Sequence, residues 1–379
     1  MAKLGRELRA QGIQVTDLSL GEPDFKTPQH IIDAATVAMD QGYTKYPPIA
    51  GFPELRQAIA AKLKRDNNLD YLPEETMVST GAKQVLANTI LCLLNPGDEA
   101  IIPTPFWVTY ASLVSLAEAK SVFIPCGIND HFKLTPERLE AAITERSRMF
   151  IFSSPCNPTG AVYTKEELAA LAQVFVKYPD IIIVSDEIYE YINYNGRHES
   201  IAQFPELRDR VVVVNGFAKG FAMTGWRLGY MAAPAELIKA CDKFQSQFTS
   251  GANSIAQRAA ITALTADLTP TMDMVQAFEE RKEYFIPALQ SIDGLKLSQP
   301  DGAFYAFPDI SSYFGKSDGE TVIRNADDMA MYLLHKGHVI GVSGAAFGDD
   351  NCIRFSFAAS MEVLQQGVEK IRAALARLH

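Results

Sequence analysis

The sequence predicts an α/β fold built on a mainly parallel sheet, together with a smaller α+β domain. Between about residues 76 and 250, short apolar segments alternate with longer amphipathic ones, which is the pattern of strand–helix–strand units. After about residue 253 this alternation gives way to helices and hairpin-like segments. The chain of 379 residues is long enough for two domains, because one domain takes roughly 100–200 residues. We therefore expect a large domain at 25–270 and a small domain formed by 1–24 and 271–379.

Each element of the alternating region has its own signal. Apolar runs predict strands, and amphipathic runs predict helices. The expected strands are 77–80, 100–105, 121–125, 148–154, 181–185, 211–214 and 228–233, and the expected helices are 82–94, 107–117, a helix opening at Thr135-Pro136, 168–178 and 234–244. Pro136 marks a helix start, because the missing N–H of proline costs little in the first turn. Thr164 and Glu167 form a capping box ahead of the following helix.

The second part of the chain is mixed. Helices are expected at 254–266 and from Thr271 toward Ile292, followed by hairpin-like segments at 295–308 and 338–357 and a closing helix at 361–378. This composition predicts an α+β domain, which the N-terminal 20 or so residues are expected to join.

Composition excludes several classes of protein. The 35 basic and 45 acidic side chains give a net charge of −10, which argues against a nucleic-acid partner, because such binding needs a basic surface. No apolar run approaches the roughly 18 residues of a membrane span. The charged N-terminus, MAKLGRELRAQG, lacks the apolar stretch of a signal peptide. Five scattered cysteines indicate neither a zinc site nor a disulfide framework. We expect a cytoplasmic enzyme without a metal or a membrane partner.

Chemically useful residues follow the predicted strands. Lys219, Asp186 and Asn157 each come after one strand, and Gly81, Ala82 and Lys83 follow another and open a helix. Ligands of parallel sheets bind where strands end, and the start of a helix binds anions. An amine, an acid, an amide and an anion site fit pyridoxal 5′-phosphate, which needs an amine for a Schiff base and an acid beside its ring nitrogen.

Nine motifs in order resemble the class I aminotransferases of the fold-type-I pyridoxal-phosphate enzymes, over essentially the whole chain. They are SLGEPDF (19–25), KYPPIAG (45–51), STGAKQ (79–84), PTPFWVTY (103–110), SSPCNPTG (153–160), VSDEIYE (184–190), AKGFAMTGWRLGY (218–230), GAFYAFP (302–308) and IRFSFA (353–358). The resemblance implies a seven-stranded, mainly parallel sheet covered by helices. It also implies a homodimer with shared active sites and a ping-pong transfer of an amino group between an amino acid and a 2-oxo acid.

The resemblance assigns catalytic roles around the cofactor ring. It implies that Lys219 forms the Schiff base and later moves the proton at the substrate α carbon. Asp186 would pair with the ring nitrogen, and Tyr189 and Asn157 would hydrogen-bond the 3-oxygen. Trp107 would stack on the ring face.

The resemblance also assigns the cofactor phosphate. Gly81, Ala82 and Lys83 would hold it together with Arg227, and Tyr46 would reach the phosphate of the partner subunit. Many relatives place a serine directly before the lysine, but Ala218 stands here. Thr80 or Thr224 is expected to replace the missing hydroxyl.

Substrate binding is expected at Arg354, Gly21, Trp107, Asn157 and Lys83. An inward-facing arginine on a strand is costly without an anionic partner, and the resemblance implies that Arg354 clamps the substrate α-carboxylate beside the Gly21 backbone. The likeness is closest to bacterial-type aspartate aminotransferases, in which the counterpart of Lys83 binds the distal carboxylate of aspartate or glutamate. Activity on aromatic amino acids, methionine or kynurenine, or a pyridoxal-phosphate lyase reaction, stays an alternative.

Overall fold

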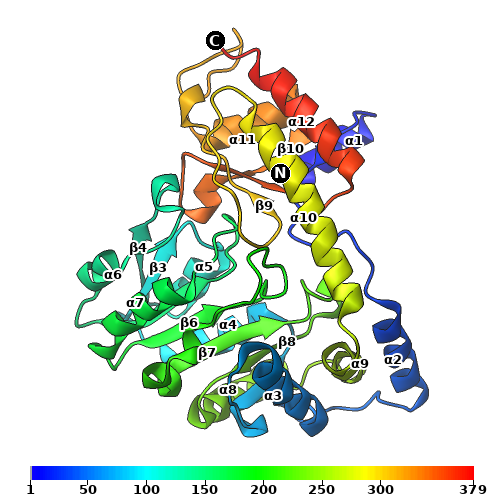
Figure 1. Cartoon of the computed structure of the whole chain (residues 1–379), viewed down its shortest axis with the longest axis vertical. Coiled ribbons are helices and arrows are strands. Elements are labelled where there is room, and N and C mark those ends of the chain that lie inside the picture. Colours follow the sequence, from blue (N-terminus) through cyan, green and yellow to red (C-terminus); the bar gives the residue numbers. More distant parts are fainter. Residues whose placement is uncertain (1) are drawn as a thin grey trace.

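A seven-stranded sheet forms the centre of the larger part of the molecule (Figure 1). The computed structural model describes residues 2–379. The strand order is β2-β8-β7-β6-β5-β3-β4. The bounds are β2 (Thr76–Ser79), β3 (Glu99–Thr104), β4 (Lys120–Pro125), β5 (Ser147–Ser153), β6 (Ile182–Asp186), β7 (Val211–Gly216) and β8 (Gly229–Ala232). Only β8 pairs antiparallel, with both β2 and β7. The prediction of a mainly parallel seven-stranded sheet is confirmed.

Helices cover both faces of this sheet. One face carries α4 (Ala82–Leu93), α5 (Thr109–Leu116) and α8 (Ala235–Phe248), and the other carries α2 (Gln29–Asp40), α3 (Pro53–Asn67), α6 (Pro136–Ala142), α7 (Lys165–Val176) and α9 (Ser254–Thr265). In β7, Val212 and Val214 pack with the first group, whereas Val211 and Val213 pack with the second. Successive side chains of a strand point to opposite faces, so a strand buried on both sides is apolar throughout.

Two predicted helix starts are confirmed. The Thr135 side chain accepts a hydrogen bond from the Arg138 N–H, with Pro136 as the first residue of α6. The capping box of Thr164 and Glu167 opens α7. Both caps supply side-chain oxygen acceptors for backbone N–H groups that have no partner within the helix.

A smaller part of the fold lies above the sheet in Figure 1. It contains α1 (Ala2–Ala10), α11 (Ala326–Lys336) and α12 (Met361–Leu375), and α10 (Thr269–Gln290) runs up to it from the large sheet (Figure 1). Its short strands are β1 (Thr16–Asp17), β9 (Tyr305–Ala306), β10 (Val339–Ile340), β11 (Val342–Ser343) and β12 (Ile353–Ser356). They form two sheets, β1-β10 and β11-β12-β9.

The two hairpin-like segments differ: 338–357 contains the expected antiparallel pair, β11 with β12, whereas 295–308 does not pair with itself. In 295–308, β9 pairs with β12, and Lys296 forms only an isolated bridge with Asp309. The pairing of β9 with the distant strand β12 is favoured over a local hairpin, because it buries Tyr305 and Ala306 completely. We propose that the chain divides into a large domain of residues 25–270 and a small domain of residues 1–24 and 271–379.

Among residues 2–379, no helix combines the length and the apolar character that crossing a bilayer requires.

Candidate active site

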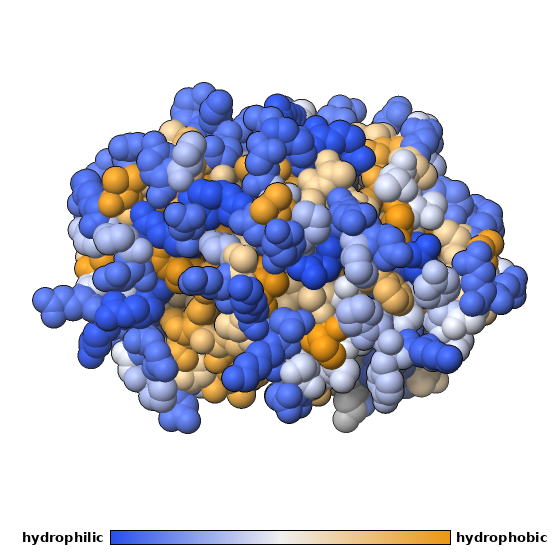
Figure 2. Space-filling model, turned by 90° about the horizontal axis from the view of Figure 1, so that it is seen from below, coloured by the Kyte–Doolittle hydropathy of each residue, from blue (hydrophilic) through white to orange (hydrophobic). Residues whose placement is uncertain are grey.

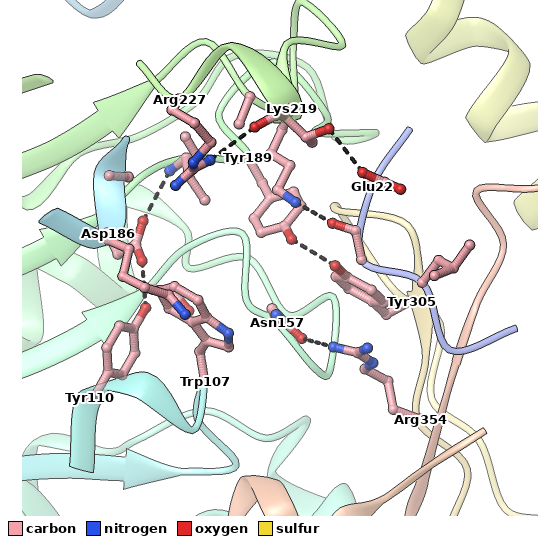
Figure 3. Close-up of a pocket in the computed structure, with 18 residues that line it drawn as sticks. Glu22, Trp107, Tyr110, Asn157, Asp186, Tyr189, Lys219, Arg227, Tyr305 and Arg354 are labelled. Atoms are coloured by element: carbon pink, nitrogen blue, oxygen red, sulfur yellow. Dashed lines mark hydrogen bonds between the residues drawn. The ribbon is translucent and has the colours of Figure 1, made fainter. Parts of the chain in front are cut away.

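The strand ends that carry the predicted site residues lie at one edge of the large sheet. Strand β8 runs antiparallel to both β2 and β7, so β2 runs in the same direction as β5, β6 and β7. A cavity of about 430 Å³ lies at this edge, within the usual size range of ligand sites. All the predicted site residues line it except Gly81, Tyr46 and Thr80 (Figure 3).

Lys219 lies just beyond β7 and is directed into the cavity (Figure 3). Its Nζ donates a hydrogen bond to the Gly21 carbonyl oxygen. Burial, and then the positive charge of Arg354, lowers the Lys219 pKa to about 8. A sizeable fraction of the amine is therefore neutral near physiological pH, and a neutral amine is a nucleophile and a base.

Asp186 is the last residue of β6 and is buried at the opposite end of the cavity from Arg354 (Figure 3). Its carboxylate accepts hydrogen bonds from the Tyr110 hydroxyl at 2.7 Å and from the Ile188 N–H at 3.3 Å. Burial raises the Asp186 pKa to about 6. Within the described chain it takes part in none of the ion pairs. A carboxylate in this setting is stabilised by a ligand that brings a positive charge.

Arg354 enters the cavity from β12. Its guanidinium donates to the Asn157 side-chain oxygen and to the Ser19 carbonyl oxygen, both at 2.8 Å. Its Nε has no hydrogen-bond partner in residues 2–379, and no carboxylate there pairs with it. A buried guanidinium without a counter-ion is costly, so this arrangement indicates an anionic ligand.

The start of α4 forms an anion cradle. Gly81 precedes the helix with a φ of 84° and no side chain caps it, so first-turn N–H groups are free for a ligand. A Cβ atom on Gly81 would lie 2.5 Å from an Arg227 Nη atom. Glycine thus lets Arg227 approach the helix start, and Arg227 is further held by its bond to the Thr224 carbonyl at 2.9 Å.

Some of the predicted residues are more exposed to solvent or lie outside the cavity. The exposed Lys83 ammonium is 4.9 Å from the centre of the half-buried Trp107 ring. Tyr46 is 93% exposed and does not line the cavity of its own chain. Of the two threonines expected to replace a serine hydroxyl, Thr224 lines the cavity and donates to Glu22 at 2.9 Å, whereas Thr80 is not among the lining residues.

Among the lining residues that the sequence did not predict, three make side-chain hydrogen bonds to other residues of the cavity. Tyr110 fixes Asp186, the Tyr305 hydroxyl hydrogen-bonds that of Tyr189 at 2.7 Å, and Glu22 accepts from Thr224. All three lie inside the quoted motifs PTPFWVTY, GAFYAFP and SLGEPDF. The motifs were therefore a signal, but these partners come from elements distant in sequence.

Comparison with known proteins agrees with this geometry. Residues 13–371 match the family described as aminotransferase class I and II. A "Bifunctional aspartate aminotransferase and glutamate/aspartate-prephenate aminotransferase" from Petunia hybrida is 48% identical, over 96% of this chain and 77% of the relative. An "Aspartate/prephenate aminotransferase" from Nitrosomonas europaea is 46% identical, over 99% of this chain and 95% of the relative.

Solved structures give the same result. The aspartate aminotransferase from Rhizobium meliloti superimposes with a TM-score of 0.97 at 41% identity, over 100% of this chain and 95% of that one. The enzyme from Thermus thermophilus with maleate gives 0.92 at 40% identity, over 98% and 95% of the two chains. With the family match covering most of the sequence, this chain belongs to the class I and II aminotransferases.

Proposed function

We propose that this chain is a pyridoxal-phosphate-dependent aminotransferase that exchanges amino groups between aspartate or glutamate and a 2-oxo acid by a ping-pong route. One observation carries the proposal. The half-buried Lys219 amine and the buried Asp186 carboxylate line one cavity, yet they form no ion pair with each other. A ligand with an electrophilic carbon and a basic nitrogen would satisfy both groups.

The cavity residues fit pyridoxal 5′-phosphate. Arg227 and the free N–H groups at the start of α4 would hold the phosphate next to Gly81, where a Cβ atom would collide with Arg227. Asp186 would face the ring nitrogen, and Trp107 would cover the ring. When bound, the cofactor supplies an electron-withdrawing ring that stabilises negative charge at the substrate α carbon.

Side chains of the protein would transfer protons and orient the cofactor ring. Lys219 Nζ, with its pKa lowered to about 8 by burial, takes and returns the proton of the substrate α carbon. The Asp186 carboxylate holds a proton on the ring nitrogen, and Tyr110 orients that carboxylate. Burial raises the Tyr189 pKa well above its ordinary value, so its hydroxyl stays a donor toward the 3-oxygen, beside Asn157.

Two cations favour a substrate with two carboxylates. Arg354 has an unpartnered donor for the α-carboxylate, and Lys83 lines the same cavity for the distal carboxylate. Prephenate, which the names of two relatives include, also carries two carboxylates, and it belongs in the panel of amino acceptors. The side chains of aromatic amino acids, methionine and kynurenine carry no carboxylate for Lys83 to bind.

Aspartate alone tests the reaction. Adding aspartate to the protein loaded with pyridoxal phosphate should convert the bound cofactor to its amine form and release one oxaloacetate for each cofactor converted. The absorption of the bound cofactor and an assay of the released product measure the two changes. Lys219→Ala should retain cofactor binding and lose turnover by at least about 10³-fold, because Lys219 supplies both the amine for the Schiff base and the base for the α-carbon proton. Near-normal turnover of this variant, or a bound cofactor that aspartate leaves unchanged in the unaltered protein, contradicts the assignment.

One arginine variant and one lysine variant test the substrate class. Arg354→Met should raise the KM for every amino acid, because all share the α-carboxylate. Lys83→Met should raise the KM for aspartate and glutamate by roughly 10-fold and leave that for alanine unchanged. Lys165→Met, which removes an exposed lysine from the first turn of α7, is the matched control. Equal effects of Lys83→Met on aspartate and alanine contradict the dicarboxylate preference.

A further inference from the structure

The turn after β6 presents different side chains to its two sides. Tyr189 lines the cavity, whereas Glu187 and Glu190 do not, although both are buried, at 1% and 6% exposed. Buried carboxylates are costly unless they are paired and hydrogen-bonded. Their partners therefore show what these two residues do.

Glu190 is held by α3. Its side chain forms an ion pair with Lys62, which has no exposed surface, and accepts a hydrogen bond from the Asn67 amide at 3.0 Å. Lys62 also donates to Asn67 at 2.7 Å, and its ammonium lies 5.2 Å from the centre of the Tyr191 ring. One end of the turn is thus fixed to a helix on the far side of the sheet from α4.

Glu187 is held by the segment that follows the turn. Its carboxylate accepts hydrogen bonds from Ser185 at 2.8 Å and Ser200 at 2.6 Å, and it pairs with His198 at 2.9 Å. Burial opposes the charged form of His198, but Glu187 outweighs it and the His198 pKa is raised. Glu187, Glu190 and His198 offer ligand-type atoms within 4.8 Å of one another, but Lys62 already supplies the cation there.

The same turn fixes two groups of the cavity. The Ile188 N–H donates to Asp186 at 3.3 Å, and Tyr189 reaches the Tyr305 hydroxyl from the next position. The backbone continues the linkage, because the Glu190 N–H donates to the Glu187 carbonyl at 2.9 Å. A shift of about 1 Å in reacting groups can cost about 100-fold in rate, so the anchors behind the turn bear directly on the site.

We propose that Glu187 and Glu190 are positioning residues, which hold the 187–190 turn from behind so that Tyr189 and Asp186 keep their places against the cofactor. The inference rests on the proposed function, because it takes these two groups to contact pyridoxal phosphate. Neither glutamate touches the cavity, so each acts only through the turn.

Conservative variants separate positioning from general stability. Glu187→Gln and Glu190→Gln keep the shape and remove the charge. Glu99→Gln is the matched control, because Glu99 is 2% exposed, pairs with Lys120 and Arg146, and begins β3 at the opposite edge of the sheet from the cavity. The readouts are the dissociation constant of pyridoxal phosphate from the apoprotein, the pH midpoint of the bound cofactor's absorption change, and the melting temperature.

All three variants should lower the melting temperature. Glu187→Gln and Glu190→Gln should in addition weaken cofactor binding by about 10-fold and move the absorption midpoint to higher pH, in the direction of Tyr189→Phe, whereas Glu99→Gln should change neither. If the two test variants behave like Glu99→Gln, the positioning role is overturned. If Tyr189→Phe leaves the midpoint unmoved, Tyr189 does not contact the cofactor, which overturns the inference together with that part of the proposed function.

A double variant covers the case in which Glu190→Gln does not fold. Lys62→Met with Glu190→Gln leaves no unpaired charge, and such neutral replacements of buried pairs are tolerated. We expect it to fold and still to show the weaker binding and the shifted midpoint. Native values of both in the folded double variant overturn the proposal.

Discussion

Burial moves the Lys219 amine and the Asp186 carboxylate toward neutrality from opposite directions. The Lys219 pKa falls to about 8 and the Asp186 pKa rises to about 6, in both cases chiefly because burial disfavours the charged form. Both groups consequently titrate close to neutral pH in the protein without ligand. Strongly shifted groups in one cavity are typical of active sites.

The first residue-scale prediction concerns the reactivity of Lys219. Acetylation of this residue in the apoprotein, followed by peptide mass spectrometry, should have a pH midpoint near 8 rather than near the ordinary lysine value of 10.5. Arg354→Met should raise that midpoint, because Arg354 is the second cause of the lowered pKa after burial. A midpoint above about 10 in the unaltered protein contradicts the burial of this amine.

A second prediction follows from the raised pKa of Asp186. The folded state binds this proton more tightly than the unfolded chain, so the stability it contributes is present at low pH and is lost as the pH rises through about 6. Asp186→Asn does not titrate. Its apoprotein should therefore gain about 1 kcal/mol of unfolding free energy relative to the unaltered apoprotein between about pH 5 and pH 8. Urea titrations measure this difference, and a constant gap between the two proteins contradicts it.

At the scale of elements, the ends of strands and the starts of helices place the reactive groups. Thr135, Pro136 and the Thr164–Glu167 pair predict helix starts because a cap is a local interaction. At Gly81, by contrast, the helix has no side-chain cap, and Arg227 occupies the space that a side chain would need.

Gly81→Ala tests this cradle, and Gly97→Ala is its control. Both glycines have a positive φ, of 84° and 88°, so alanine should cost about 1 kcal/mol of stability at either site. Only at Gly81 would the new Cβ meet Arg227, whereas nothing lies within 4 Å at Gly97. Pyridoxal phosphate binding, followed by the absorption of the bound cofactor, should weaken by at least about 10-fold in Gly81→Ala alone. Equal binding in both variants means that Arg227 does not hold the phosphate.

At the scale of the whole molecule, Tyr46 and several apolar side chains remain uncovered in one chain. Tyr46 is 93% exposed, and Val37, Met39 and Phe248 are between 51% and 72% exposed. Figure 2 shows apolar residues gathered among hydrophilic ones on the face seen from below. We propose that a homodimer covers part of this surface and brings Tyr46 to the cofactor phosphate of the partner subunit.

Mixing two damaged chains tests whether sites are shared. Lys219→Ala and Tyr46→Ala chains, unfolded and refolded together at limiting pyridoxal phosphate, should recover activity. If Tyr46 acts across the interface, a hybrid dimer carries both defects in one site and none in the other. Refolding each variant alone is the control. If the mixture shows only the averaged activity of the separate variants, Tyr46 does not serve the partner's site.

Local sequence was enough to predict most of the residues that line the cavity and the segments that form the large sheet. Motif order and apolar runs depend on local sequence, and they place Lys219, Asp186 and Asn157 after strands that the structure contains. The antiparallel position of β8, the pairing of β9 with β12 and the hydrogen bonds of Tyr110 and Tyr305 depend on tertiary contacts. These contacts join residues far apart in the chain, and long-range pairing leaves no periodic signal in the segments that it joins.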